Sequence, residues 1–228
     1  MAHSLLLVDD EPRIRRVLRL ALEDEGYEVV APNLPGTEPE VGMEVWARRV
    51  LELVAGSVIP IGCSMGGYLA FELWRQARDR IEAIGLVDTR ATADTAEQRQ
   101  ARDDAIRLLG EEGFDAFWER TAPKLYAGDD PGARAIAADQ PITGLVASLQ
   151  TLRDRPDSRE ALPRIDVPVL VVVGDEDELT PPRDAEDMVA ALPDARLLTL
   201  PGAGHLTPLE RPEQVTEALL GFLHEVAP

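Results

Sequence analysis

The chain of 228 residues has a single cysteine, Cys63, so it forms no internal disulfide and we expect a reducing, cytoplasmic environment. Cationic side chains are also few, because 23 lysines and arginines stand against 42 aspartates and glutamates, for a formal net charge of -19. Such an acidic surface disfavours nucleic acid and anionic membranes as partners. No stretch approaches the roughly 20 apolar residues of a membrane-spanning helix. We expect a monomer or weak homodimer in an aqueous compartment.

Signals for export and for metal binding are scarce as well. The opening residues, MAHSLLLVDDEP, lack the cationic region and long apolar run of a secretory leader, so we expect none. Of the three histidines, His3 and His224 lie near the termini and only His205 lies in a glycine-rich loop. Asp9 and Asp10 are adjacent, but two carboxylates without a third ligand make a weak Mg²⁺ site. We therefore expect no metal and no cofactor.

The stretch 58–67, VIPIGCSMGG, combines an apolar run with a glycine-flanked serine. The run predicts a buried strand, and the residues after it predict a helix over 67–78. Gly62, Ser64 and Gly66 fit the pattern G-x-S-x-G, in which a nucleophilic serine lies on a strained strand-to-helix turn and a side chain in place of either glycine would collide with backbone. Alone, the pattern also fits a Gly/Ser turn before an ordinary helix.

Two more strand-and-loop units follow downstream. An apolar run over 167–173 ends in Gly174 and three acids, and a run over 195–200 is followed by the loop that contains His205. The order serine, acid, histidine along the chain is one of the orders found in catalytic triads. Three motifs in this order, each at the end of a predicted strand, indicate one site built from all three loops.

These motifs, GCSMGG from Gly62, GDEDELTPP from Gly174 and PGAGHLTPLERPEQV from Pro201, resemble the α/β-hydrolase superfamily and in particular its small esterases. The resemblance extends from about residue 29 to the C-terminus. It implies an α/β fold, a three-layer sandwich with a mainly parallel sheet, and hydrolysis of small-molecule carboxylic esters. We expect one domain over 1–228.

The resemblance also assigns roles to individual residues. Ser64 is the expected nucleophile, His205 the proton shuttle, and Asp177, three residues after the glycine, the acid that orients the imidazole. The backbone N–H of Met65, at the start of the following helix, is an oxyanion donor. Asp88 is an alternative acid because it also follows a buried strand, predicted over 81–87, but it ranks below Asp177.

Residues 90–164 read as an insertion between two strands of the sheet. Their pattern predicts helices over 95–109, 113–126 and 143–153. The resemblance implies that this insertion is a small helical cap, with Phe114, Phe117 and Trp118 lining an acyl pocket. The same aromatic residues also fit ordinary packing between helices.

The N-terminal stretch 1–30 has a different resemblance. Its sequence is similar to the opening β-α-β of a response-regulator receiver domain, which has a flavodoxin-like fold; the similar stretch is LLLVDDEPRIRRVLRLALEDEGYEVV. A receiver needs a phosphoacceptor aspartate and a lysine at later strand ends, where this chain has the Ser64 turn and only acids. We therefore expect no phosphoryl acceptance, and we interpret the chain as an engineered or recombined chimera; a divergent hydrolase is the alternative.

The junction between the receiver-like segment and the hydrolase-like segment affects the expected oxyanion site. Hydrolases of this type take a second oxyanion donor from a loop of small residues, which follows the strand that corresponds to residues 4–8 here. Here Asp9, Asp10, Glu11 and Pro12 occupy that place, and proline has no N–H. Losing one donor costs about 10²- to 10³-fold in rate. We expect a weakened esterase, with a catalytically silent chimeric scaffold as the alternative.

Overall fold

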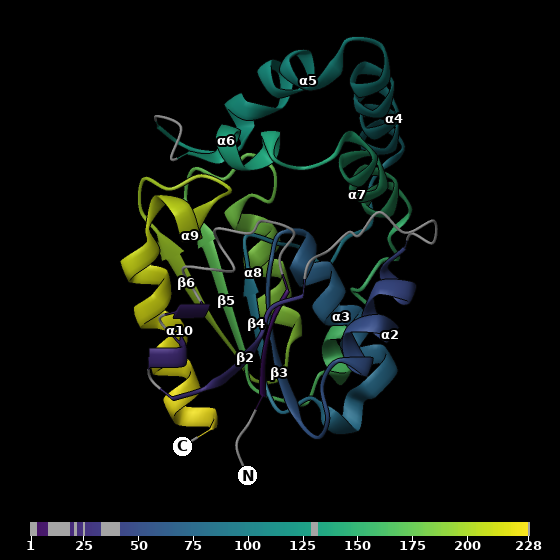
Figure 1. Cartoon of the computed structure of the whole chain (residues 1–228). Helices are drawn as coiled ribbons and strands as arrows, with labels where there is room; N and C mark the ends of the chain where they lie inside the picture. The colour runs from purple at the N-terminus through teal and green to yellow at the C-terminus, as the bar shows by residue number, and fades with distance from the viewer. Residues whose placement is uncertain are drawn as a thin grey trace.

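The computed structural model describes residues 4–8, 19–20, 22–24, 26–32, 42–128 and 132–227. Within these ranges six strands form one sheet: β1 (Ser4–Val8), β2 (Glu28–Val30), β3 (Val58–Cys63), β4 (Ile84–Val87), β5 (Val169–Gly174) and β6 (Ala195–Leu200). Their order is β2-β1-β3-β4-β5-β6, and every pairing is parallel (Figure 1). The predicted mainly parallel α/β sheet is confirmed.

The central strands are buried on both faces. Every residue of β3, β4 and β5 is buried, as continuous apolar runs predict for parallel strands covered on both sides. The predicted start of β4 at residue 81 is wrong, because Ile81 makes only an isolated bridge to Val58. The pairing with β5 begins at Ile84 and Val169, directly after Pro168, which has no N–H to contribute.

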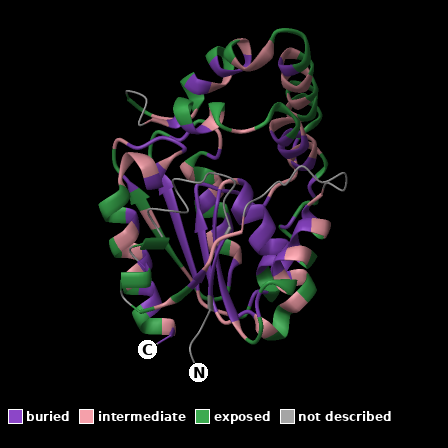
Figure 2. Cartoon of the chain, in the orientation of Figure 1, coloured by how far each residue is buried: buried purple, intermediate pink, exposed green. Residues whose placement is uncertain are grey.

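Helices cover both faces of the sheet and make the three-layer sandwich. On one face lie α2 (Met43–Glu52), α3 (Met65–Ala77) and α8 (Pro182–Ala191), whose apolar side chains share a core cluster with Leu6 of β1. On the other face lies α10 (Pro212–Val226), which shares a second cluster with Leu5 and Leu7. Successive residues of β1 thus point to opposite faces, as in any strand. Figure 2 shows the buried sheet between these layers.

The helices over residues 96–154, in the connection between β4 and β5, lie beyond the carboxyl ends of the strands (Figure 1). They are α4 (Ala96–Glu111), α5 (Gly113–Thr121), η2 (Ala122–Lys124), α6 (Ala133–Ala138) and α7 (Ile142–Asp154). The single helix predicted over 113–126 is wrong: α5 ends at Thr121, and a 3-10 turn that contains Pro123 follows. Proline lacks the N–H that would continue the α-helical ladder.

The shorter elements are η1 (Arg78–Arg80), η3 (Leu162–Arg164) and α9 (Thr207–Glu210). At the N-terminus β1 lies between β2 and β3, as expected for the β-α-β unit. Most of the helix predicted between β1 and β2 lies outside the described residues, as do Asp9 and Asp10. None of the helices in the described ranges combines the length and apolarity needed to cross a membrane.

Candidate active site

Ser64 lies at the turn between β3 and α3, with φ 47° and ψ -107°. Positive φ is rare for a residue with a side chain and indicates local strain. A Cβ on Gly62 would lie 2.2 Å from the backbone carbon of Gly66, so only glycine fits there. On Gly67 it would lie 2.4 Å from the side chain of Thr89. The helix begins at Met65, two residues before its predicted start, and its first turn contains Gly67, where close packing against Thr89 requires a glycine.

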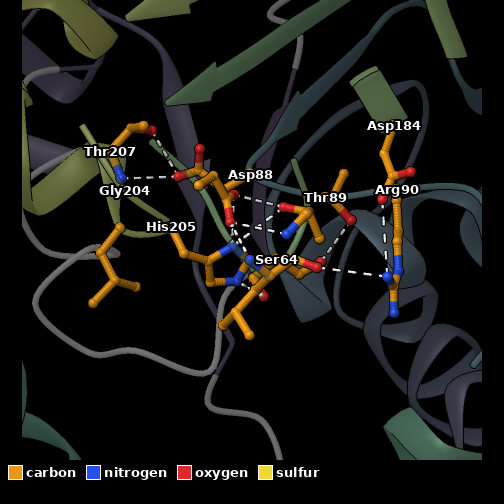
Figure 3. A network of polar contacts seen from close by, with 12 residues as sticks. Ser64, Asp88, Thr89, Arg90, Asp184, Gly204, His205 and Thr207 are labelled. Atoms are coloured by element: carbon orange, nitrogen blue, oxygen red, sulfur yellow. Dashed lines mark hydrogen bonds and ion pairs between the residues drawn. The ribbon is translucent and has the colours of Figure 1, made fainter. Parts of the chain in front are cut away.

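His205 lies in the loop between β6 and α9 and faces the serine. Its Nε2 atom is 2.7 Å from Ser64 Oγ, a hydrogen bond that joins residues 141 positions apart (Figure 3). His205 is 4% exposed. The loop turns at Gly202, where φ is 64°, and a Cβ on Gly174 would lie 2.2 Å from the carbonyl oxygen of Ala203. Glycines thus let the histidine loop approach the end of β5 closely.

Asp177 holds the other side of the imidazole. Its Oδ2 atom is 2.8 Å from His205 Nδ1 and also accepts a hydrogen bond from Thr180 Oγ1 at 2.7 Å. Its Oδ1 atom accepts the backbone N–H groups of Leu179 and Thr180, both at 2.8 Å. Both oxygens of this buried carboxyl group therefore have donors, which fixes its orientation.

The environment of Asp177 favours its charged form. Burial raises the pKa of Asp177, but hydrogen bonding and electrostatic attraction to His205, together with the donors of Thr180, lower it, and the net pKa lies below the ordinary value. The group is therefore a carboxylate at neutral pH. An ionised partner on Nδ1 leaves Nε2 free to accept a proton from the serine.

The neighbouring acids have other contacts. Asp175 Oδ1 accepts the backbone N–H of Gly202 at 2.6 Å, at the turn of the histidine loop. Asp88, the alternative acid, is fully buried, and its Oδ2 accepts two hydrogen bonds from Thr207. Burial, together with the negative charges of Asp177 and Glu210, raises the pKa of Asp88 well above its ordinary value, against the lowering effect of Thr207.

Glu210, at the end of α9, ties the histidine loop to the segment that follows η2. Its carboxylate accepts the backbone N–H groups of Gly204 at 3.0 Å and Leu206 at 3.3 Å, on either side of the histidine. It also accepts the N–H of Ala127 at 2.9 Å. A Cβ on Gly204 would lie 2.7 Å from that same nitrogen, so the two segments are in direct contact.

The remaining predicted site residues lie around these three loops. Met65 is the first residue of α3, where backbone N–H groups have no acceptor within the helix. Phe117 belongs to a cluster between α4, α5 and α7, as helix packing would require. Trp118 belongs to a second cluster that includes Leu206, next to the histidine. Phe114 packs against both clusters, so the pocket-lining role of the three aromatics stays a prediction.

The described part of the chain contains no group of three or more His, Cys, Asp or Glu side chains placed to hold a metal ion. Asp9 and Asp10, the pair considered for Mg²⁺, lie outside it. Cys63, beside the nucleophile, is a buried thiol. The reactive groups that the structure brings into contact are the serine, the imidazole and the carboxylate.

Sequence reasoning missed three residues that hold this geometry: Thr180, Thr207 and Glu210. Thr180 lies three positions after Asp177 and binds its carboxylate, a spacing typical of side-chain capping turns. Thr207 and Glu210 are within five residues of the histidine, but their partners Asp88 and Ala127 are 119 and 83 positions away. Their closeness to His205 in the sequence is the only signal that could have identified Thr207 and Glu210.

Comparison with known proteins shows which family and which solved structures this chain resembles. A match to the Alpha/beta hydrolase family covers residues 10–218. A thermophilic esterase from Thermogutta terrifontis, solved with malate bound, is 32% identical, with a TM-score of 0.90 over 99% of this chain and 91% of that one. The pimeloyl-[acyl-carrier protein] methyl ester esterase of Nitrosomonas europaea is 30% identical over 72% of this chain and 71% of its own length. Polyketide synthase ThaQ of Burkholderia thailandensis is 27% identical, but the chain spans only 10% of that protein.

Proposed function

The chain belongs to the alpha/beta hydrolase family, and from this premise we propose that it is a serine hydrolase that cleaves small carboxylic esters. The observation that carries the proposal is the continuous chain of hydrogen bonds from Ser64 Oγ through His205 to Asp177, with distances of 2.7 and 2.8 Å. Nucleophile, base and orienting acid within hydrogen-bond reach are what this reaction needs. The esterases among the similar proteins support the substrate class.

The proposed reaction has two steps. Ser64 Oγ attacks the ester carbonyl while His205 Nε2 takes its proton, and the N–H of Met65 binds the oxyanion that forms. The alcohol leaves with the proton from His205, and the acyl group remains on the serine. Water then gives a proton to His205 and attacks the acyl carbon; the bond to Ser64 Oγ breaks, His205 returns the proton to this oxygen, and the acid is released. Asp177 orients the imidazole and stabilises its protonated form.

The domain organisation of the chain and its rate of ester hydrolysis are proposals as well. We propose one domain with residues 90–164 as a cap over the carboxyl ends of the strands. The expected weak turnover depends on Asp9 and Pro12, which lie outside the described residues. The same sequence feature favours the second candidate, a silent scaffold that joins receiver-like and hydrolase segments, and an absence of Ser64-dependent turnover would favour that candidate.

The test is hydrolysis of p-nitrophenyl acetate and butyrate by equal amounts of folded protein. We expect the parent to release p-nitrophenol and Ser64→Ala to fall to the uncatalysed rate, because the nucleophile is removed. Ser148→Ala is the matched control, since Ser148 is a buried serine of α7 in the cap and should keep the parental rate. Equal rates for parent and Ser64→Ala would refute the proposal.

A further inference from the structure

The segment 87–90, at the end of β4, contacts all three loops that carry the proposed triad. The carbonyl oxygen of Val87 accepts the N–H of Ser64 at 2.8 Å, and Thr89 Oγ1 donates to the carbonyl oxygen of Ser64 at 2.9 Å. Asp88 accepts two hydrogen bonds from Thr207, beyond the histidine. Arg90 Nη1 lies 3.5 Å from the carbonyl oxygen of Leu179, two residues after the acid. Figure 3 shows Asp88 on the side of Thr207 and Thr89 close to Ser64, with Arg90 farther away beside Asp184.

The backbone of Asp88 is strained, which singles it out within this segment. Its φ is 48°, and in the described ranges Ser64 is the only other residue with a side chain and a positive φ. The Asp88 N–H donates to the carbonyl oxygen of Val172 at 2.9 Å, so β5 fixes the strained peptide in place. Strain of this kind persists where the surroundings determine it, and it is concentrated at functional sites. Two strained residues at the ends of adjacent strands mark the same site.

The Asp88 carboxyl group makes its known contacts through one oxygen. Oδ2 accepts Thr207 N at 2.9 Å and Thr207 Oγ1 at 2.7 Å, whereas Oδ1 is buried without a partner among the described atoms. Thr207 is the first residue of α9, is fully buried, and follows His205 by two positions. Asp88 therefore holds the start of α9, and with it the end of the histidine loop.

We propose that Asp88 is a positioning residue that fixes the histidine loop relative to the nucleophile turn. The inference rests on the proposed function and adds a residue to it. The segment binds the backbone of Ser64 on one side and Thr207 on the other, so one strand end sets the spacing between nucleophile and base. Asp88 does not supply the orienting charge, because Asp177 already holds His205 Nδ1 at 2.8 Å.

The two possible roles of Asp88 make opposite demands on its charge. An orienting acid must be ionised, whereas an anchor for Thr207 needs only an oxygen that accepts two hydrogen bonds. Burial beside Asp177 and Glu210 raises the pKa of Asp88, which favours the neutral form. An asparagine keeps the accepting oxygen and loses the charge, so it separates the two roles. An alanine removes both.

The test compares Asp88→Asn with Asp88→Ala in steady-state ester hydrolysis. We expect alanine to lower kcat by about 10²-fold with KM nearly unchanged, because the histidine is misplaced while ester binding is untouched. Asparagine should stay within about threefold of the parent, because both Thr207 donors keep their acceptor. Equal losses for both variants would make Asp88 an orienting charge, and an unaffected alanine variant would remove the positioning role; either result overturns the proposal.

Two further measurements keep the proposal testable. If Asp88→Ala does not fold, Thr207→Val removes one of the two donors and should still lower kcat, and an unchanged kcat overturns the proposal. The imidazole ¹⁵N signals of His205, assigned with His205→Ala, give a readout independent of turnover. We expect these signals to shift in Asp88→Ala and to match the parent in Asp88→Asn; identical signals in all three proteins overturn the proposal. A parent without Ser64-dependent hydrolysis would refute only the proposed function.

Discussion

Replacement of Asp177 by asparagine should give the protein the wrong histidine tautomer. The reason lies in the four donors around the carboxylate. Oδ1 accepts two backbone N–H groups, from Leu179 and Thr180, so the amide oxygen of an asparagine must occupy this position. The amide nitrogen then takes the place of Oδ2 and donates to His205 Nδ1. With Nδ1 as an acceptor, Nε2 carries the hydrogen and cannot accept the proton of Ser64.

The expected loss in kcat follows from the proposed role of Asp177 as the acid that orients His205. A triad with a neutral amide in place of its acid loses about 10⁴-fold in kcat. At about 1.36 kcal/mol for each factor of ten, this corresponds to about 5.5 kcal/mol of transition-state stabilisation. The fold should survive, because the asparagine oxygen keeps both backbone hydrogen bonds and the amide nitrogen can donate to Thr180 Oγ1.

The assay is kcat for p-nitrophenyl butyrate at neutral pH, with thermal unfolding measured on the same samples. Asp175→Asn is the matched control, because Asp175 lies two positions away and contacts the turn of the histidine loop rather than the imidazole. We expect it to stay within about threefold of the parent, since its acceptor oxygen is kept. If Asp177→Asn loses less than about tenfold, another group orients His205, and the reasoning is refuted.

Three other predictions concern the surroundings of the site. Gly62→Ala places a Cβ 2.2 Å from backbone and should destabilise the protein by about 3 kcal/mol or more in urea unfolding, whereas Gly110→Ala, with open space in α4, should not destabilise it; equal effects would contradict this. Glu210→Gln loses one of the two oxygens that bind three backbone N–H groups, and should cost about 1–3 kcal/mol of stability, with an unchanged urea midpoint as the contrary result. The pKa of Asp88 is raised in the folded state, so the folded protein holds the Asp88 proton at pH values where the unfolded chain has lost it. The free energy of unfolding therefore falls as pH rises from the unfolded pKa of about 3.9 through the raised pKa of the folded state. Asp88→Asn should not show this fall when its unfolding free energies at pH 5 and pH 8 are compared with those of the parent. The same change with pH in both proteins would refute this prediction.

The strands and the three triad candidates could be predicted because their signals are local. A strand followed by glycine and a reactive side chain is visible within ten residues, as at Ser64 and His205. The order of the sheet and the parallel pairing then bring these loop ends to one edge. Local patterns also explain the α/β class, because alternating strands and helices leave few topologies.

What could not be predicted depends on contacts between distant residues. The sequence pattern predicts a helix that begins at Gly67, because glycine is a poor helix former, yet α3 begins at Met65 and its first turn includes Gly66 and Gly67, where Thr89 approaches Gly67 too closely for a side chain. Asp88 binds Thr207, 119 positions away, and Glu210 binds the backbone of Ala127, 83 positions away. No pattern along the chain reports such pairs.

The most direct test of the account is covalent capture of the nucleophile with an alkyl fluorophosphonate, followed by peptide mass spectrometry. The serine oxygen would form a bond to phosphorus as fluoride leaves, with the serine proton taken by His205. We predict one phosphonyl adduct, on Ser64, in the parent, and strongly reduced labelling in His205→Ala. An unlabelled parent, or an adduct on another residue such as Cys63, would contradict the claim that these three loops assemble a working triad.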